Sequence, residues 1–253
     1  MQAAREAGEL ISGNFQKLQH GDVQRKGKND FVTRVDKEAE AIITEVISAS
    51  FPNHQILGEE SGFSAQKGEH LWVIDPLDGT TNFIQGIAHF SVSLALMKNG
   101  SVIFGLIYDP NLKECFHAAS GQGAFINDAP ILVGETRQLG SAFGATGFPF
   151  KAPQLLPPYA DVFKSLMSHC QDMRRCGSAA LDLAYVACGR YDFFWEAHLL
   201  PWDFMAGKLI VEEAGGRTSD FAGRELPVLT SSVLAANRYL YPELLQLVGP
   251  VFN

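Results

Sequence analysis

Apolar residues recur every three or four positions in several segments, which is the spacing of one face of an α-helix. This pattern predicts helices over residues 3–19, 160–168, 179–188, 202–214 and 242–247, and another that opens at Asp36. The first has no capping residue before it, which fits a helix that continues upstream of Met1. Helical segments therefore occur in both halves of the chain.

Shorter apolar segments bounded by turn residues predict strands. The clearest are residues 90–97 and 101–108, which flank Asn99-Gly100, a dipeptide that favours a tight antiparallel turn. Antiparallel hairpins among helices indicate a layered α/β fold with mixed sheets. Residues 20–29 and 147–158 predict loops. The other predicted strands are residues 31–33, 56–57, 71–74, 115–118, 124–126, 141–146, 172–174, 191–196 and 232–236.

Composition narrows the class of protein. The chain has 253 residues, 46% of them hydrophobic and 19% charged, as is usual for a globular protein. Its net charge of -8 argues against a nucleic-acid binder with a broadly basic surface. The four cysteines form no C-x-x-C pair, which fits reduced thiols in the cytoplasm. No apolar run reaches the length of a membrane span, so we expect a soluble protein.

Two carboxylates lie where a buried strand meets a turn. The apolar run 71–74 leads to Asp75, and Asp78 follows three residues later. Pro76 favours an extended conformation at the residue before it, so the strand is predicted to stop at Asp75. Oxygen ligands of this kind favour a hard divalent cation. The same pattern, Asp-Pro-x-Asp-Gly, is also that of an ordinary surface turn.

A helix start is predicted directly after these carboxylates. Gly79 can adopt backbone conformations that are unfavourable for other residues, and Thr80 or Thr81 is suited to cap a helix. The backbone N–H groups at a helix N-terminus favour phosphate. This stretch therefore indicates a metal-assisted phosphate site.

Other acidic residues have both a structural and a functional interpretation. Asp36 and Asp203 each stand at a predicted helix start, where an acid caps the helix or complements its dipole. Glu59 and Glu60 follow a strand between glycines, as in a solvated turn or a metal site, and Glu196 ends a strand. The residues themselves leave both interpretations open.

Longer motifs resemble the inositol monophosphatase family nearly end to end. They are Gly-Glu-Glu-Ser at 58–61, Trp-Val-Ile-Asp-Pro-Leu-Asp-Gly-Thr-Thr-Asn-Phe at 72–83 and Trp-Asp-x-x-Ala-Gly at 202–207. Residues 26–33 and 177–187 are similar to the bacterial extragenic-suppressor type within that family. The resemblance implies the layered αβαβα fold of the inositol monophosphatase and fructose-1,6-bisphosphatase type. It also implies a single catalytic domain, residues 1–253, with a metal- and phosphate-binding lobe up to about residue 139 and a substrate-recognition lobe from about residue 140.

The resemblance further implies two to three Mg²⁺ ions and inhibition by Li⁺. Glu59, Asp75 and the carbonyl of Leu77 would hold the first ion. Asp75, Asp78 and Asp203 would hold the second, and a third would lie near Glu59. The metal ligands implied are therefore Glu59, Asp75, Leu77, Asp78 and Asp203.

Roles for other residues also come from the resemblance. Glu59 and Thr80 would activate the attacking water, with Asp36 orienting Thr80. The implied substrate-binding residues are Asp78, Gly79, Thr80, Gly177, Ser178, Ala179, Glu196 and Asp203. Many animal members have threonine where this chain has Ser178, a departure that keeps the hydroxyl group.

The implied activity is that of an inositol-1-monophosphatase, a cytoplasmic, homodimeric phosphoric monoester hydrolase acting on myo-inositol 1-phosphate and related polyol monophosphates. A related phosphatase acting on fructose 1,6-bisphosphate, histidinol phosphate or 3′-phosphoadenosine phosphate is one alternative. Another is a binding partner of RNA polymerase and the bacterial transcription antitermination complex, for which Arg174, Arg175 and Arg190 are candidate contacts. These arginines are equally compatible with ordinary surface charges.

Overall fold

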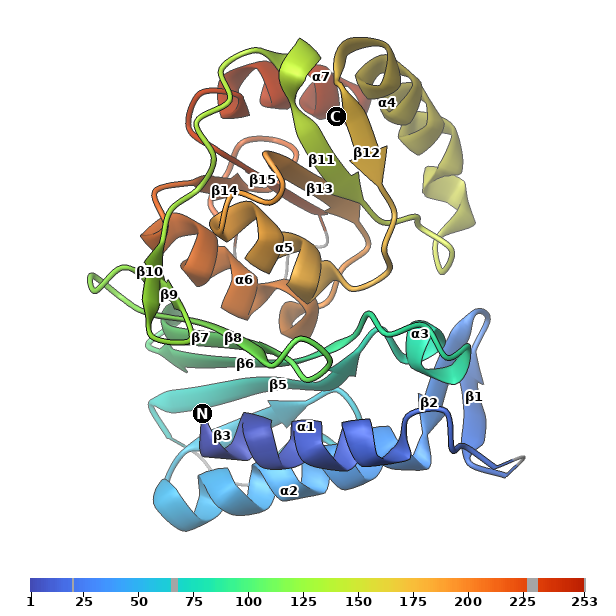
Figure 1. Cartoon of the computed structure of the whole chain (residues 1–253), viewed down its shortest axis with the longest axis vertical. Helices are drawn as coiled ribbons and strands as arrows, with labels where there is room; N and C mark the ends of the chain where they lie inside the picture. Colours follow the sequence, from blue (N-terminus) through green and yellow to red (C-terminus); the bar gives the residue numbers. More distant parts are fainter. Residues whose placement is uncertain (20, 65–67, 227–231, 253) are drawn as a thin grey trace.

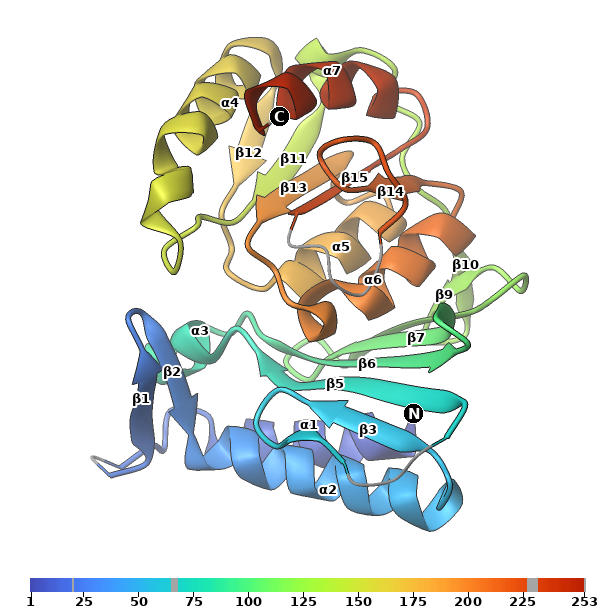
Figure 2. The same cartoon turned by 180° about the vertical axis from the view of Figure 1, so that it is seen from behind.

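Two β-sheets separated by a pair of helices form the body of the molecule (Figures 1 and 2). Helices α1 and α2 cover the outer face of the larger sheet, and α4 and α7 cover the outer face of the smaller one. This computed structural model describes all residues except 20, 65–67, 227–231 and 253. The order of layers confirms the predicted mixed-sheet α/β fold of the αβαβα type.

The larger sheet has eight strands in the order β10-β9-β8-β7-β6-β5-β3-β4. Its neighbours pair antiparallel except β3 and β5, which are parallel. The strands are β3 (Gln55–Gly58), β4 (Gly62–Phe63), β5 (His70–Asp78), β6 (Ser91–Lys98), β7 (Ser101–Asp109), β8 (Glu114–Ala119), β9 (Ala124–Ile126) and β10 (Ala129–Ile131).

The predicted hairpin at Asn99-Gly100 is confirmed as β6 and β7. Asn99 and Gly100 have φ values of 50° and 84°, the left-handed conformations that such a turn requires. Along β6, Val92 and Leu94 face the core beneath α1 and α2, whereas Ala95 faces the core beneath α5 and α6. Burial on both faces explains the nearly continuous apolar sequence of this strand.

Helix α1 (Gln2–Asn14) is shorter than predicted, whereas α2 (Arg34–Ser50) begins within two residues of the predicted position. Phe15 is extended and Gln16 has φ 59°, so the helix ends before the last apolar positions of the pattern. Phe15 and Leu18 nevertheless pack on the core beneath the sheet. Their spacing therefore reflects burial and not helical conformation.

Part of the predicted loop 20–29 is a strand, with residue 20 outside the described residues. Strand β1 (Val23–Gly27) pairs antiparallel with β2 (Asp30–Thr33), which lies at the predicted position. Most β1 side chains are exposed. Because the strand is held by backbone pairing, its sequence shows no alternation of apolar residues.

The smaller sheet has five strands in the order β12-β11-β13-β15-β14. Strand β11 is parallel to both of its neighbours, and the remaining pairs are antiparallel. The strands are β11 (Phe143–Thr146), β12 (Asp172–Arg174), β13 (Phe193–Ala197), β14 (Arg217–Ser219) and β15 (Ser232–Ala236). The chain crosses from the larger to the smaller sheet between β10 and β11, and the division into two functional lobes near residue 140 stays a prediction.

The helices on this side differ from prediction mainly at α4. It begins at Leu156, inside the predicted loop, because Pro157 and Pro158 occupy its first turn, where proline is tolerated. The helices that follow α2 are α3 (Thr80–Ile84), α4 (Leu156–His169), α5 (Ala179–Ala187), α6 (Pro201–Glu213) and α7 (Tyr241–Phe252), with short 3₁₀ turns at Leu139–Ser141 and Pro153–Leu155. Within the described ranges, no helix is both long and apolar enough to cross a bilayer.

Candidate active site

A bulge near the end of β5 turns its two carboxylates to one side. The sequence predicted that the strand stops at Asp75, but β5 continues to Asp78. Asp75 pairs with Ser93 and Asp78 with Ser91, so β5 has one more residue than its partner in this interval. Residues three apart in a regular strand face opposite sides, and the extra residue brings both carboxylates into the same cavity. Pro76 is accommodated here because a bulge does not need its missing N–H.

Gly79, and not a threonine, is the N-cap of α3. Its φ of 97° lies in the left-handed region, and a Cβ there would stand 3.0 Å from the carbonyl oxygen of His89. The predicted capping role of Thr80 or Thr81 is therefore wrong. The turn after Asp78 needs a left-handed backbone conformation, which glycine adopts without the steric strain of a Cβ. Thr80 is the first residue of the helix.

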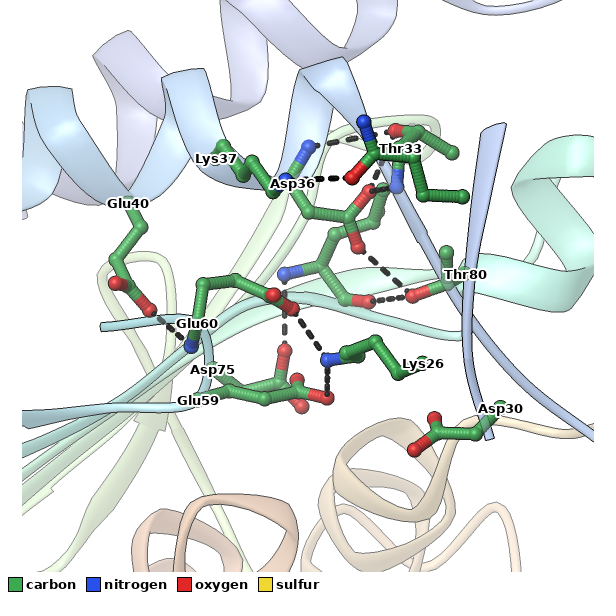
Figure 3. A network of polar contacts seen from close by, with 12 residues as sticks. Lys26, Asp30, Thr33, Asp36, Lys37, Glu40, Glu59, Glu60, Asp75 and Thr80 are labelled. Carbon is green, nitrogen blue, oxygen red and sulfur yellow. Dashed lines mark hydrogen bonds and ion pairs between the residues drawn. The ribbon is translucent and has the colours of Figure 1, made fainter. Parts of the chain in front are cut away.

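The Thr80 side chain is linked to helix α2 through Asp36 (Figure 3). Its Oγ1 donates to Asp36 Oδ1 at 2.9 Å and also lies 3.0 Å from the Leu77 carbonyl oxygen. Asp36 Oδ2 accepts from the backbone N–H and the hydroxyl of Thr33, at 2.9 and 2.5 Å. Asp36 thus combines the two interpretations of the sequence: one oxygen completes the helix cap, and the other holds Thr80.

Glu59 lies at the end of β3, in a turn fixed by Glu40 of α2 (Figure 3). Glu40 accepts from the backbone N–H groups of Glu60 and Ser61, each at 2.9 Å. A Cβ at Gly58 would stand 2.5 Å from the Glu40 carboxylate, so this close approach requires glycine. The sequence analysis missed Glu40, although its position four residues after Asp36 puts both on one face of the helix.

Lys26, from the strand predicted as a loop, bridges two acids. Its Nζ lies 3.0 Å from Glu59 Oε1 and 2.7 Å from Glu60 Oε1. Burial opposes the charge of this ammonium, but the two neighbouring carboxylates outweigh it and raise the pKa of Lys26. A cation is therefore already held against this carboxylate pair.

Helix α5 docks onto Asp78. The Ser178 hydroxyl and the Ala180 N–H donate to Asp78 Oδ2 at 2.6 and 2.8 Å. Ser178 also caps α5 by accepting from the Leu181 N–H. Its buried hydroxyl therefore points to Asp78 and not into the cavity.

Asp203 and Glu196 are brought from α6 and β13. Asp203 Oδ2 accepts from the Leu200 N–H at 2.7 Å and so holds the start of α6, as the capping interpretation predicted. Glu196 faces Gly147, where a Cβ would stand only 1.9 Å from its Oε1. Arg175 lines the same cavity, and its positive charge partly offsets the effect of burial on the pKa of Glu196.

The elements converge on one cavity of about 580 Å³, which is lined by residues of both sheets. Asp36 and Ser178 do not line the cavity themselves. Each forms a hydrogen bond to a lining residue, Asp36 to Thr80 and Ser178 to Asp78. Lining residues that the sequence analysis did not single out include Phe148, Phe150 and Lys151. The predicted site residues that line it are Glu59, Asp75, Leu77, Asp78, Gly79, Thr80, Gly177, Ala179, Glu196 and Asp203.

Four carboxyl groups of this cavity have pKa values raised above their ordinary range. Burial, together with neighbouring acids, raises the pKa of Asp75 and Asp203 well above the ordinary range. Burial also raises the pKa of Asp78 to about 6 and that of Glu196 to about 8. A crowded set of oxygen donors with little compensating positive charge fits hard divalent cations.

This arrangement defines the class: a layered α/β phosphatase. The model of the "Inositol monophosphatase family" matches residues 1–251, and the chain belongs to that family. It is 48% identical to "Nus factor SuhB" of Escherichia coli (strain K12) over 238 residues, which are 94% of this chain and 89% of the relative.

Solved structures agree with the family assignment. The extragenic suppressor protein suhB of Bartonella henselae superposes with a TM-score of 0.94 at 39% identity, covering 98% of this chain and 95% of that one. The staphylococcal SaIMPase-II with bound inositol monophosphate gives 0.81 at 31%, covering 98% and 92%. The predicted likeness to the extragenic-suppressor type is confirmed.

Proposed function

We propose that this phosphatase hydrolyses myo-inositol 1-phosphate and related polyol monophosphates to the alcohol and inorganic phosphate. The observation that carries the proposal is the convergence of Glu59, Asp75, Asp78 and Asp203 on one cavity beside the N-terminus of α3. The similarity to an enzyme with bound inositol monophosphate supports the choice of substrate.

The donor set suits Mg²⁺. Glu59, Asp75, Asp78, Asp203 and the carbonyl oxygen of Leu77 would hold two to three ions. When bound, Mg²⁺ neutralises the phosphate, lowers the pKa of water and stabilises the attacking and leaving oxygens.

The protein's own groups would then position the attack. Thr80 donates its hydroxyl proton to Asp36, so its Oγ1 lone pairs can accept a hydrogen bond from the attacking water. Glu59 Oε2, the oxygen not bound by Lys26, would take the proton that the water loses. As the new P–O bond forms, the ester P–O bond breaks, and a second water molecule would protonate the departing alkoxide. The hydroxide that this leaves would take the proton held by Glu59. The backbone N–H groups of Gly79 and Thr80 would receive the phosphate oxygens.

Alcohol recognition would fall to Glu196, Gly177 and Ala179. Since its pKa is about 8, Glu196 is largely protonated at neutral pH and can both donate to and accept from substrate hydroxyls. Ser178 would contribute indirectly, by holding Asp78.

The test is phosphate release from a panel of monoesters with Mg²⁺, without it, and with added Li⁺. The panel holds both inositol 1-phosphate enantiomers, inositol 2-phosphate, β-glycerophosphate, histidinol phosphate, fructose 1,6-bisphosphate and adenosine 3′,5′-bisphosphate. We expect Mg²⁺-dependent, Li⁺-inhibited turnover led by inositol 1-phosphate. Faster turnover of another ester would change the assigned substrate but would still support a phosphatase.

The Asp78→Asn variant tests the site residues, because it removes a charge that would bind Mg²⁺. We expect kcat to fall at least about hundredfold. Asp161→Asn, at an exposed position of α4, is the matched control and should retain activity. Near-normal activity of the Asp78 variant would contradict the ligand assignment.

The names of the curated relatives favour a second candidate function. Relatives 42–48% identical are called Nus factor, so we propose binding to RNA polymerase with antitermination factors as a further role. Of the three arginines, Arg190 pairs with both oxygens of Glu114, and Arg175 lines the cavity. Arg174, which forms its ion pair with nearby Asp172 at the surface, is therefore the candidate contact. Tagged protein should recover polymerase from a bacterial lysate, and recovery should fall with Arg174→Glu; no recovery would favour a purely metabolic enzyme.

The proposed function also includes a cytoplasmic homodimer. Light scattering on the purified protein would give its mass directly, and a single chain of 27.6 kDa would contradict the dimer.

A further inference from the structure

A second cluster of potential metal ligands lies outside the carboxylate cavity. A side-chain ligand atom of each of His89, Cys176 and Asp182 lies within 4.8 Å of the others. His89 precedes β6 of the larger sheet, whereas Cys176 precedes α5 and Asp182 lies within α5. None of the three has a role in the proposed hydrolysis.

Two members of the cluster have polar atoms without a hydrogen-bond partner among the described residues. They are both carboxylate oxygens of Asp182, which is fully buried, and Nε2 of His89. A buried charge without a partner is strongly unfavourable, and native proteins rarely leave such groups unsatisfied. The cluster therefore lacks a group that would satisfy a carboxylate and an imidazole together.

The backbone around the cluster is held in place by Asn82. Its side-chain amide donates to the carbonyl of His89 at 2.7 Å and to that of Cys176 at 2.9 Å. These bonds fix the two segments that carry the imidazole and the thiol, one from each side of the central layer. The Cys176 sulfur lies 3.5 Å from the Tyr191 hydroxyl.

We propose that His89, Cys176 and Asp182 bind a borderline-soft divalent cation, with Zn²⁺ as the natural candidate. Sulfur, imidazole nitrogen and carboxylate oxygen are the three ligand types that Zn²⁺ favours, whereas Mg²⁺ prefers oxygen alone. With bond lengths of about 2.0–2.3 Å, ligand atoms of a tetrahedral zinc site lie roughly 3.3–3.7 Å apart, a modest contraction from the observed limit.

Protonation is consistent with this ligand set. Burial lowers the pKa of His89, which favours the neutral imidazole that a metal ligand requires. Binding releases the Cys176 thiol proton, together with any proton on Asp182. A cation here would join the segment before β6 to α5. The inference is independent of the proposed phosphatase substrate.

The test uses Co²⁺, because a cobalt–thiolate bond gives a charge-transfer band that oxygen ligands do not. Metal-depleted full-length protein is titrated with Co²⁺ in excess Mg²⁺, which competes for the carboxylate cavity. We expect a thiolate band that saturates at one Co²⁺ per chain, and a rise of a few degrees in the melting temperature with Zn²⁺.

Matched cysteine variants assign the band. Cys176→Ser should abolish it and the thermal shift, whereas Cys170→Ser, on the half-exposed cysteine after α4, should leave both unchanged. Asp182→Asn and His89→Gln should weaken Co²⁺ affinity at least tenfold without loss of the folded circular dichroism spectrum. A band that survives in Cys176→Ser, or the absence of any thiolate band in the wild type, would overturn the proposal.

Discussion

Gly147 shows how a single missing side chain shapes the part of the cavity around Glu196. An added Cβ would stand 1.9 Å from Glu196 Oε1, well inside contact distance. Gly147→Ala should therefore displace the Glu196 carboxyl group and lower kcat/KM for inositol 1-phosphate about tenfold, the cost of roughly one hydrogen bond. Steady-state kinetics measure this. Gly140→Ala, whose Cβ would meet only the His169 carbonyl at 3.7 Å, is the control, and equal kinetics for both variants would argue against a role for Glu196.

The raised pKa of Asp78 predicts how the metal-free protein responds to pH. Burial raises that pKa from 3.8 to about 6, so the folded state holds the proton more tightly than the unfolded chain. Its contribution is complete below pH 3.8 and is lost as pH rises through about 6. The loss is on the order of 3 kcal/mol for this one group.

Melting temperatures in EDTA should thus fall between pH 4 and pH 7, and Mg²⁺ should restore most of the loss. Asp78→Asn should flatten the pH dependence, because the amide does not titrate. A profile in EDTA that rises over this interval, or one unchanged in the variant, would show that other groups dominate.

At the scale of elements, helix α2 holds the segments that follow two strands. It does so with two acidic side chains on adjacent turns of one helix face. Asp36 holds Thr80 after β5, and Glu40 holds the turn after β3. The geometry around the carboxylate cavity thus depends on the register of this helix against the sheet.

Glu40→Gln should expose that dependence, because an amide cannot accept from both backbone N–H groups. We expect a loss of about 2 kcal/mol in the free energy of unfolding, measured in urea, and a lower kcat as Glu59 loses its position. Glu38→Gln, on the exposed face and paired with Arg34, should cost less than about 0.5 kcal/mol. Equal stability of the two variants would contradict the role of Glu40.

At the scale of the molecule, the site depends on close contact between the larger sheet and α6. Gly105 of β7 lies so near this helix that a Cβ would stand 2.6 Å from the Ala206 carbonyl oxygen. Asp203 occupies the first turn of the same helix, so any displacement of α6 moves a carboxylate relative to Asp75 and Asp78.

Gly105→Ala should force backbone apart and cost roughly 1–3 kcal/mol of stability, with a fall in Mg²⁺ affinity. Thermal unfolding and the Mg²⁺ dependence of activity measure the two effects. Gly13→Ala, where no atom of the described residues lies within 4 Å of the added Cβ, should leave both unchanged. If the Gly105 variant is destabilised but keeps its Mg²⁺ dependence, the contact between β7 and α6 does not position the carboxylates.

The sequence by itself determined the hairpin at Asn99-Gly100, most strands and helices, and the family with its candidate carboxylates. These follow from local signals: alternation of apolar residues, turn dipeptides and contiguous motifs. It could not determine where β5 ends, because the bulge depends on pairing with β6. Nor did it reveal β1, which is held by backbone pairing with β2.

Only the tertiary structure decided which polar groups meet. Glu40 and Lys26 reach the Glu59 turn, Ser178 reaches Asp78, and His89 meets Cys176 and Asp182. Bonded residues of this site are far apart in the sequence: 20 residues separate Glu40 from Glu60, and 102 separate Asp78 from Ala180. The sequence records what each side chain can do, but the packing of sheets and helices fixes its neighbours, because distant contacts arise from burial and leave no local pattern.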